Sequence, residues 1–121
     1  ASKSRGLGDV YKRQALNDAS IENGCPWIAP GLHKYGTLRH WWADIGFQCL
    51  QQSPDDALAL PLRAGSIAVF SSLTPHRTGP NLTAQTRKAY ILQYAPDGAA
   101  MHHRNGEIDF AADPERQFLI T

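Results

Sequence analysis

Two residues eleven positions apart, His76 and Arg87, have side chains that could carry chemistry. An imidazole binds metal ions, and the planar guanidinium of an arginine binds a carboxylate through two parallel hydrogen bonds. A buried arginine without an anion is unfavourable, so Arg87 predicts either an internal Asp or Glu partner or a bound carboxylate. The sequence does not decide between these two partners of Arg87. His76 is one candidate metal ligand, although a single histidine in a loop is also typical of a surface or capping residue.

The remaining histidines and the cysteines do not complete a metal site by their spacing. No two histidines lie four residues apart, as a helical zinc site requires, and no Cys-x-x-Cys occurs. The four further histidines are His33, His40, His102 and His103. Trp41 and Trp42 fit either the mouth of a substrate site or a plug at the edge of a core. A small zinc protein built on the histidines is the least favoured interpretation.

Two segments predict strands that would position His76 and Arg87. Residues 66–70 are a compact β-rich run, which predicts a strand buried on both faces, and His76 follows it in a proline-bearing loop. Residues 87–94 alternate, which predicts a second strand with Arg87, Ala89 and Ile91 on one face.

The rest of the chain predicts short strands separated by turns. Further strand candidates are residues 26–30, 58–62 and 117–120, whereas helix is limited to single turns within 35–53 and at 54–58. Short strands at this spacing with little helix favour a β-sandwich or barrel.

Residues 1–14 differ in composition from the rest of the chain. They are glycine-rich and basic, and their residues follow neither the period of a strand nor that of a helix. Residues 8–14 resemble a translated adaptor or vector sequence. We therefore predict a non-native or disordered extension at 1–14 and one domain at 15–121, with a native flexible tail as the alternative for 1–14.

Size, charge and cysteine content set the broad class of the protein. The 121 residues, 42% of them hydrophobic, fit one globular domain, and the formal net charge of +1 gives no reason to expect nucleic acid or a membrane as partner. No apolar run approaches the roughly 20 residues of a membrane span. Two cysteines are too few for a disulfide framework, so a reduced cytoplasmic protein is expected.

Three segments, taken in order, resemble the phytanoyl-CoA dioxygenase family of Fe(II)- and 2-oxoglutarate-dependent oxygenases. Residues 15–34 resemble the family's run that contains Asn-Gly-Cys followed by Pro-Gly-x-His-Lys, with Leu32 where the family usually has Ser or Thr. Residues 62–70 resemble its glycine-led strand that ends in Phe, and residues 76–89 resemble its distal histidine and cosubstrate arginine at the same separation. The resemblance covers roughly residues 15–96.

This resemblance implies a fold, two cofactors and three site residues. The fold is a double-stranded β-helix, a cupin-like jelly-roll barrel. The cofactors are Fe(II), held by two histidines and one carboxylate, and 2-oxoglutarate. His76 corresponds to the distal iron ligand, Arg87 to the partner of the far carboxylate of 2-oxoglutarate, and Thr78 to a hydroxyl residue that supports this cosubstrate. The implied reaction couples oxidative decarboxylation of 2-oxoglutarate to hydroxylation of a C–H bond in a small organic substrate.

One departure from the family pattern affects the iron site. The other two ligands come from a His-x-Asp/Glu motif upstream of the Asn-Gly run, and this chain contains neither His-x-Asp nor His-x-Glu. We therefore expect a C-terminal fragment whose barrel is incomplete on its N-terminal side and which is inactive alone. The alternative is a non-catalytic jelly-roll module that binds a small molecule. The substrate and the oligomeric state are not specified by the sequence, and residues 35–57 are the expected substrate-selecting loop.

Overall fold

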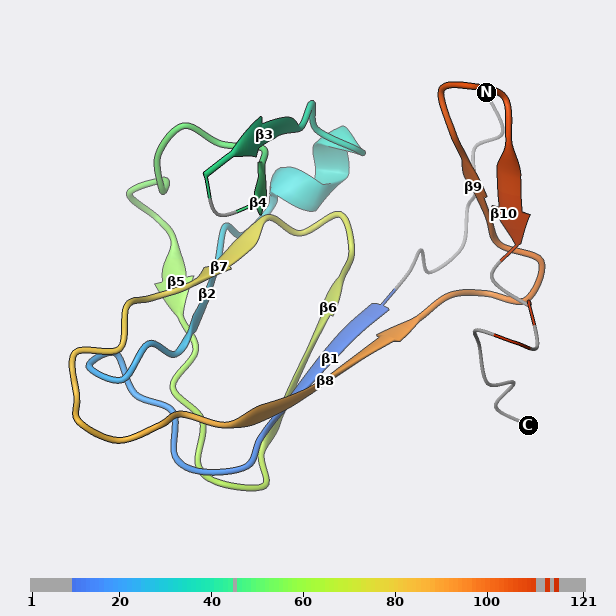
Figure 1. Ribbon diagram of the computed structural model, residues 1–121. Helices are drawn as coiled ribbons and strands as arrows, with labels where there is room; N and C mark the ends of the chain where they lie inside the picture. The colour runs from blue at the N-terminus through green and yellow to red at the C-terminus, as the bar shows by residue number, and fades with distance from the viewer. Residues whose placement is uncertain (1–9, 45, 111–112, 114, 116–121) are drawn as a thin grey trace.

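Two three-stranded antiparallel sheets form the body of the protein in the computed structural model, which describes residues 10–44, 46–110, 113 and 115 (Figure 1). The first sheet has the order β6-β1-β8, made of β1 (Val10–Ala15), β6 (Ile67–Ser71) and β8 (Ala89–Tyr94). The second has the order β5-β2-β7, made of β5 (Leu58–Ala59), β2 (Pro26–Ile28) and β7 (His76–Thr78). Because β6 and β7 follow one another in the chain, the short segment between them connects the two sheets.

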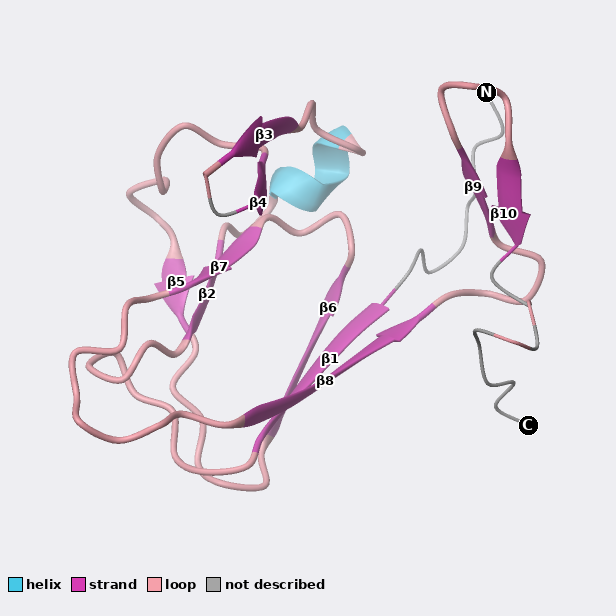
Figure 2. Ribbon diagram, in the orientation of Figure 1, coloured by secondary structure: helices cyan, strands magenta, loops and turns pink. Residues whose placement is uncertain are grey.

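The remaining elements are short and local. Among the described residues, the helical element is the 3₁₀ turn η1 (Leu32–Tyr35), drawn as a helix in Figure 2. One hairpin is made of β3 (Trp41–Ala43) and β4 (Gly46–Gln48). A second hairpin, made of β9 (Ala100–His102) and β10 (Ile108–Phe110), stands apart from the two sheets (Figure 1). The predicted mainly β architecture is confirmed.

Regular structure begins before the predicted domain boundary at residue 15. Val10–Gln14, expected to lie in a non-native or disordered extension, belong to the central strand of the first sheet. β1 pairs with β6 on one side and with β8 on the other, so it satisfies backbone groups of both neighbours. This pairing outweighs the weak β pattern of the segment, which is why composition did not predict a strand here; it does not bear on the predicted non-native origin of residues 1–14.

The first sheet has an inner face that carries functional candidates and an outer face that is exposed. Tyr11 pairs with Phe70 and Arg13 with Ala68, and these four residues share the inner face. On the outer face Ile67 is 44% and Val69 63% exposed. The prediction that the strand at 66–70 is buried on both faces is therefore wrong, because no described segment covers the outer face.

Several other predicted elements differ in detail. The loop expected at 35–53 contains the β3–β4 hairpin, and His76 begins a strand because its backbone pairs with Ile28. The turn expected at 54–58 is present and is closed by a hydrogen bond from Ala57 N to Pro54 O of 3.0 Å. The strand predicted at 117–120 lies outside the described residues.

The described core is built from small residues. Its buried apolar members are Ala15, Ala19, Cys25 and Ala29. Cys25 and Cys49 are both free thiols. The chain exposes 9,800 Å², whereas a compact protein of 13.3 kDa is expected to expose roughly 6,500 Å². None of the helices within the described ranges is long and apolar enough to cross a membrane.

A close approach of two glycines fixes β2 against the segment that follows β7. Gly24 has φ +89°, and a Cβ built on it would lie 2.5 Å from the carbonyl oxygen of Gly79. Gly79 N in turn donates a hydrogen bond of 3.2 Å to the carbonyl of Cys25. Residue 24 therefore needs glycine both for its left-handed backbone and for the contact that holds β7 in register.

We expect Gly24→Ala to destabilise the fold far more than Gly31→Ala. Gly31 has φ +80°, so alanine is strained at both positions, but a Cβ on Gly31 meets nothing within 4 Å. The steric contact with Gly79 should therefore cost Gly24→Ala roughly 1–3 kcal/mol more of unfolding free energy. Urea unfolding of the two variants measures this difference, and equal losses would refute the proposed glycine contact.

The large exposed surface predicts that the isolated 121-residue chain self-associates. Exposed apolar side chains on the outer face and the unpaired edges of β6 and β8 favour association with other chains. Analytical ultracentrifugation at micromolar concentration should detect oligomers or aggregates, accompanied by strong binding of a hydrophobic dye. A monomer that binds no dye at the same concentration contradicts this prediction.

Candidate active site

His76 is held in a defined tautomer at the start of β7. Its Nδ1 lies 3.0 Å from the carbonyl oxygen of Thr74. A carbonyl only accepts hydrogen bonds, so this contact assigns the proton of the neutral imidazole to Nδ1. The lone pair of Nε2 is then available, which is the state in which a histidine binds a metal ion.

The surroundings of His76 favour its neutral form. The imidazole is half-buried between Tyr11 and Phe70, with ring centroids 5.2 Å and 4.9 Å away. Burial lowers the pKa of His76 and outweighs the opposite effect of the hydrogen bond to Thr74, and the charge of Arg13 lowers the pKa by a smaller amount. A proton therefore competes less strongly for Nε2 than it would at an exposed histidine.

His76 and Thr78 line a cavity of about 400 Å³ between the second sheet and the segment 46–57. The sheet side of this cavity is formed by residues of β2 and β7. The other side includes residues 46–54, which belong to the loop expected to select the substrate. Arg77 also lines the cavity and connects the strand to this loop, since its Nε donates a hydrogen bond to Ser53 Oγ at 2.9 Å.

The tryptophan pair lies on the β3–β4 hairpin and does not line this cavity. Trp41 is 38% and Trp42 70% exposed, so neither plugs a core within the described structure. Trp42 packs edge-on against Phe47, with ring centroids 5.1 Å apart. Phe47 does line the cavity, so the hairpin contributes to the site through this residue.

Arg87 lies just before β8 and lines a second, polar concavity of about 360 Å³. Asn23 and Gly79 contribute to the same concavity, which places Arg87 beside the glycine contact. No Asp or Glu forms an ion pair with Arg87 in the part of the chain that the structure describes. The internal acidic partner, one of the two alternatives for Arg87, is thus not observed there. His76 and Arg87 line different cavities.

Arg13 interacts electrostatically with both His76 and Arg87, and no motif in the sequence pointed to it. The residue is half-buried, and its Nε is buried without a hydrogen-bond partner among the described residues. Burial lowers the pKa of Arg13, and the charge of Arg87 lowers it further. The alternation of inner-face residues along β1 could have identified Arg13, had residues 1–14 been treated as part of the fold.

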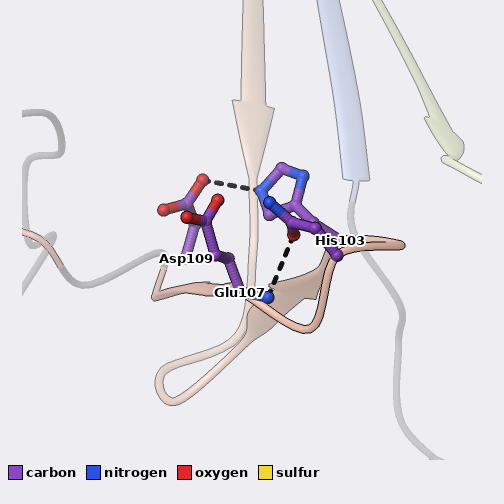
Figure 3. A network of polar contacts seen from close by, with 4 residues as sticks. His103, Glu107 and Asp109 are labelled. Carbon is purple, nitrogen blue, oxygen red and sulfur yellow. Dashed lines mark hydrogen bonds and ion pairs between the residues drawn. The ribbon is translucent and has the colours of Figure 1, made fainter.

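The other four histidines are exposed. His40 Nδ1 contacts the carbonyl oxygen of Leu38 at 2.7 Å. His103 Nε2 lies 2.8 Å from Asp109 Oδ2 in the β9–β10 hairpin (Figure 3). The backbone N of His103 donates to Glu107 O at 2.9 Å. Within the described ranges no three His, Cys, Asp or Glu residues gather as a metal site. These residues therefore offer iron one candidate ligand, His76, and not a complete set.

The lowered pKa of His76 predicts a pH-dependent contribution to stability. The unfolded chain binds the proton more tightly than the folded chain, so the free energy of unfolding should fall as pH drops below about 6.5. His76→Gln should reduce this dependence between pH 8 and 5.5 in urea unfolding. His33→Gln, at an exposed histidine, controls for the loss of an imidazole. An unchanged pH dependence in His76→Gln would contradict the assignment.

The chain matches the family model of phytanoyl-CoA dioxygenase over residues 13–89. Among curated relatives, it is 30% identical to a phytanoyl-CoA dioxygenase of Arabidopsis thaliana, over 88% of this chain and 39% of the relative. It is 32% identical to a methylphosphonate hydroxylase of Gimesia maris, over 86% of this chain and 38% of the relative. The chain therefore spans about two fifths of the length of these relatives.

A solved structure agrees with this match in sequence and in fold. EvdO2 from Micromonospora carbonacea superposes with a TM-score of 0.68 at 32% identity, over 90% of this chain and 42% of that protein. Its complex with 2-oxoglutarate superposes with a TM-score of 0.67 at the same identity, over 89% of this chain. The expected jelly-roll fold, incomplete relative to the whole barrel, is confirmed. The chain belongs to the phytanoyl-CoA dioxygenase family of iron- and 2-oxoglutarate-dependent oxygenases.

Proposed function

We propose that this chain is the C-terminal part of an Fe(II)- and 2-oxoglutarate-dependent dioxygenase that hydroxylates a small organic substrate. The proposal rests mainly on the burial, protonation and tautomer of His76 in a chain that belongs to this family. The imidazole is half-buried at a cavity of about 400 Å³, is biased toward its neutral form, and presents a free Nε2 because Nδ1 is bound to Thr74. These are the properties that one iron ligand of such an enzyme requires.

Each of the three candidate residues has a distinct role in this proposal. His76 Nε2 holds one coordination position of iron, which supplies the oxidative chemistry when bound. Arg87 binds the far carboxylate of 2-oxoglutarate, and the hydroxyl of Thr78 supports the cosubstrate from the strand that carries His76. Residues 46–54 contact the substrate across the cavity and restrict the access of water.

The proposal predicts different behaviour for the isolated chain and for a longer protein. The 121-residue chain should not decarboxylate 2-oxoglutarate, because its described residues offer a single iron ligand. A protein extended by the natural sequence upstream of residue 15, carrying a His-x-Asp or His-x-Glu motif, should do so with iron present. Release of labelled carbon dioxide from 2-oxoglutarate measures both. Turnover by the isolated chain would contradict the proposal that the other iron ligands come from the upstream sequence.

Arg87→Ala tests the cosubstrate contact in the extended protein. Loss of a charge-assisted hydrogen bond should weaken 2-oxoglutarate binding roughly 10- to 100-fold. Lys88→Ala is the matched control, because it removes the same charge from the adjacent position, where alternation along the strand directs the side chain to the opposite face. Unchanged affinity in Arg87→Ala refutes the contact. An extended protein that binds a small molecule with no turnover would favour the alternative, a non-catalytic jelly-roll module.

A further inference from the structure

The side chain of Arg13 lies on the inner face of the first sheet. Tyr11, Arg13 and Ala15 alternate with Lys12 and Gln14 along β1, so they share one face. That face is the inner one, since Ala15 is buried and Tyr11 packs on His76 and on Phe70, at 5.2 Å and 5.9 Å between ring centroids.

Arg87 is directed to the same face from the neighbouring strand. β8 pairs with β1 so that Ala89 lies opposite Ala15 and Ile91 opposite Arg13. The pairing continues toward Arg87, because Leu16 N donates to Lys88 O at 3.0 Å and Lys88 N donates to Asn17 Oδ1 at 2.7 Å. Arg87 precedes β8 by two residues, and alternation continued back from Ala89 would direct its side chain to the inner face.

Two guanidinium groups on one partly buried face repel one another. The effect appears in the pKa of Arg13, which burial lowers first and the charge of Arg87 lowers next. The inner-face positions of the sheet hold no acid to offset it: they are Tyr11, Arg13, Ala15, Ala68, Phe70, Ala89, Ile91 and Gln93. An anion bound between the arginines would compensate both charges.

The buried Nε of Arg13 indicates the kind of anion. A guanidinium can bind a carboxylate side-on, through Nε–H and one Nη–H, with two parallel hydrogen bonds. In Arg13 the Nε is shielded from solvent and has no partner among the residues described. A buried donor without a partner is unfavourable. A planar acceptor with two oxygens, such as a carboxylate, would supply the missing hydrogen bond at this position.

We propose that Arg13 is a second cationic contact, beside Arg87, for the carboxylate of a small dicarboxylate bound on the inner face. The proposal rests on the function assigned above to Arg87 and extends it to a residue on a different strand. Arg13 lies in the segment for which a foreign origin was predicted, but it is also the first residue of the family match. The inference concerns the chain with this residue at position 13.

Equilibrium dialysis of the 121-residue chain in metal-free buffer tests the proposal whatever its state of association. The probes are labelled 2-oxoglutarate and succinate, with acetate as a monocarboxylate competitor. Arg13→Gln and Arg87→Gln should each weaken dicarboxylate binding roughly tenfold or more. Lys12→Gln is the matched control: it removes the same charge from the adjacent residue of β1, which points to the outer face opposite Val69 and Leu92, and its affinity should equal that of the parent.

The outcomes separate this inference from the proposed function. Unchanged binding in Arg13→Gln with loss in Arg87→Gln overturns the role of Arg13 and leaves that of Arg87 intact. Unchanged binding in both variants, or no binding by the parent at millimolar probe, overturns both roles. If Lys12→Gln weakens dicarboxylate binding as much as Arg13→Gln does, the loss reflects net charge alone, and the inference is also overturned.

A thermal measurement distinguishes a binding role from a structural one. Without added anion, Arg13→Gln should unfold at a higher temperature than the parent, because it removes a charge that burial and then repulsion by Arg87 both disfavour. With 2-oxoglutarate it should gain less than the parent. Arg13→Lys, which keeps the charge and lacks the Nε–H, should bind with an affinity between those of the parent and Arg13→Gln. A lower unfolding temperature in Arg13→Gln, with an undiminished gain from the anion, contradicts the proposal.

Discussion

The pairing of β1 with both β6 and β8 is the constraint on which the candidate site depends. It places Tyr11 against His76 and Phe70, and it brings Arg13 to the face that Arg87 also occupies. Without a central strand, β6 and β8 would have no common neighbour in the sheet. The surroundings that bias His76 toward its neutral form and the accumulation of positive charge therefore have one structural origin.

The second sheet controls the geometry of His76 itself. Pairing of Ile28 with His76 extends β7 into what the sequence presents as a loop, and the contact between Gly24 and Gly79 prevents the two strands from separating. A strand conformation at residue 76 fixes the direction of the imidazole, and the carbonyl of Thr74 fixes its tautomer. Backbone pairing thus orients the ring, and a single hydrogen bond selects which nitrogen is available.

The sequence predicted local features well and long-range ones poorly. The alternation in 87–94 located β8, which begins at Ala89, because this pattern depends on neighbouring residues. Arg13 was missed, since its importance arises from two strands that are 50 or more residues away in the chain. The exposure of Val69 was missed for a related reason: a β-rich run specifies a strand but not what covers it.

The charges of the inner face would link His76 to the two arginines under the proposed role of Arg13, although His76 and Arg87 line different cavities. Burial is the main cause of the lowered pKa of His76 and the charge of Arg13 a minor one, while burial and the charge of Arg87 lower the pKa of Arg13. A dicarboxylate bound to the arginines would partly neutralise Arg13 and so weaken its effect on His76. If the proposed anion binds, its binding and the protonation of the imidazole would be coupled through Arg13, which is a cause of the lowered pKa of His76 and is itself affected by Arg87.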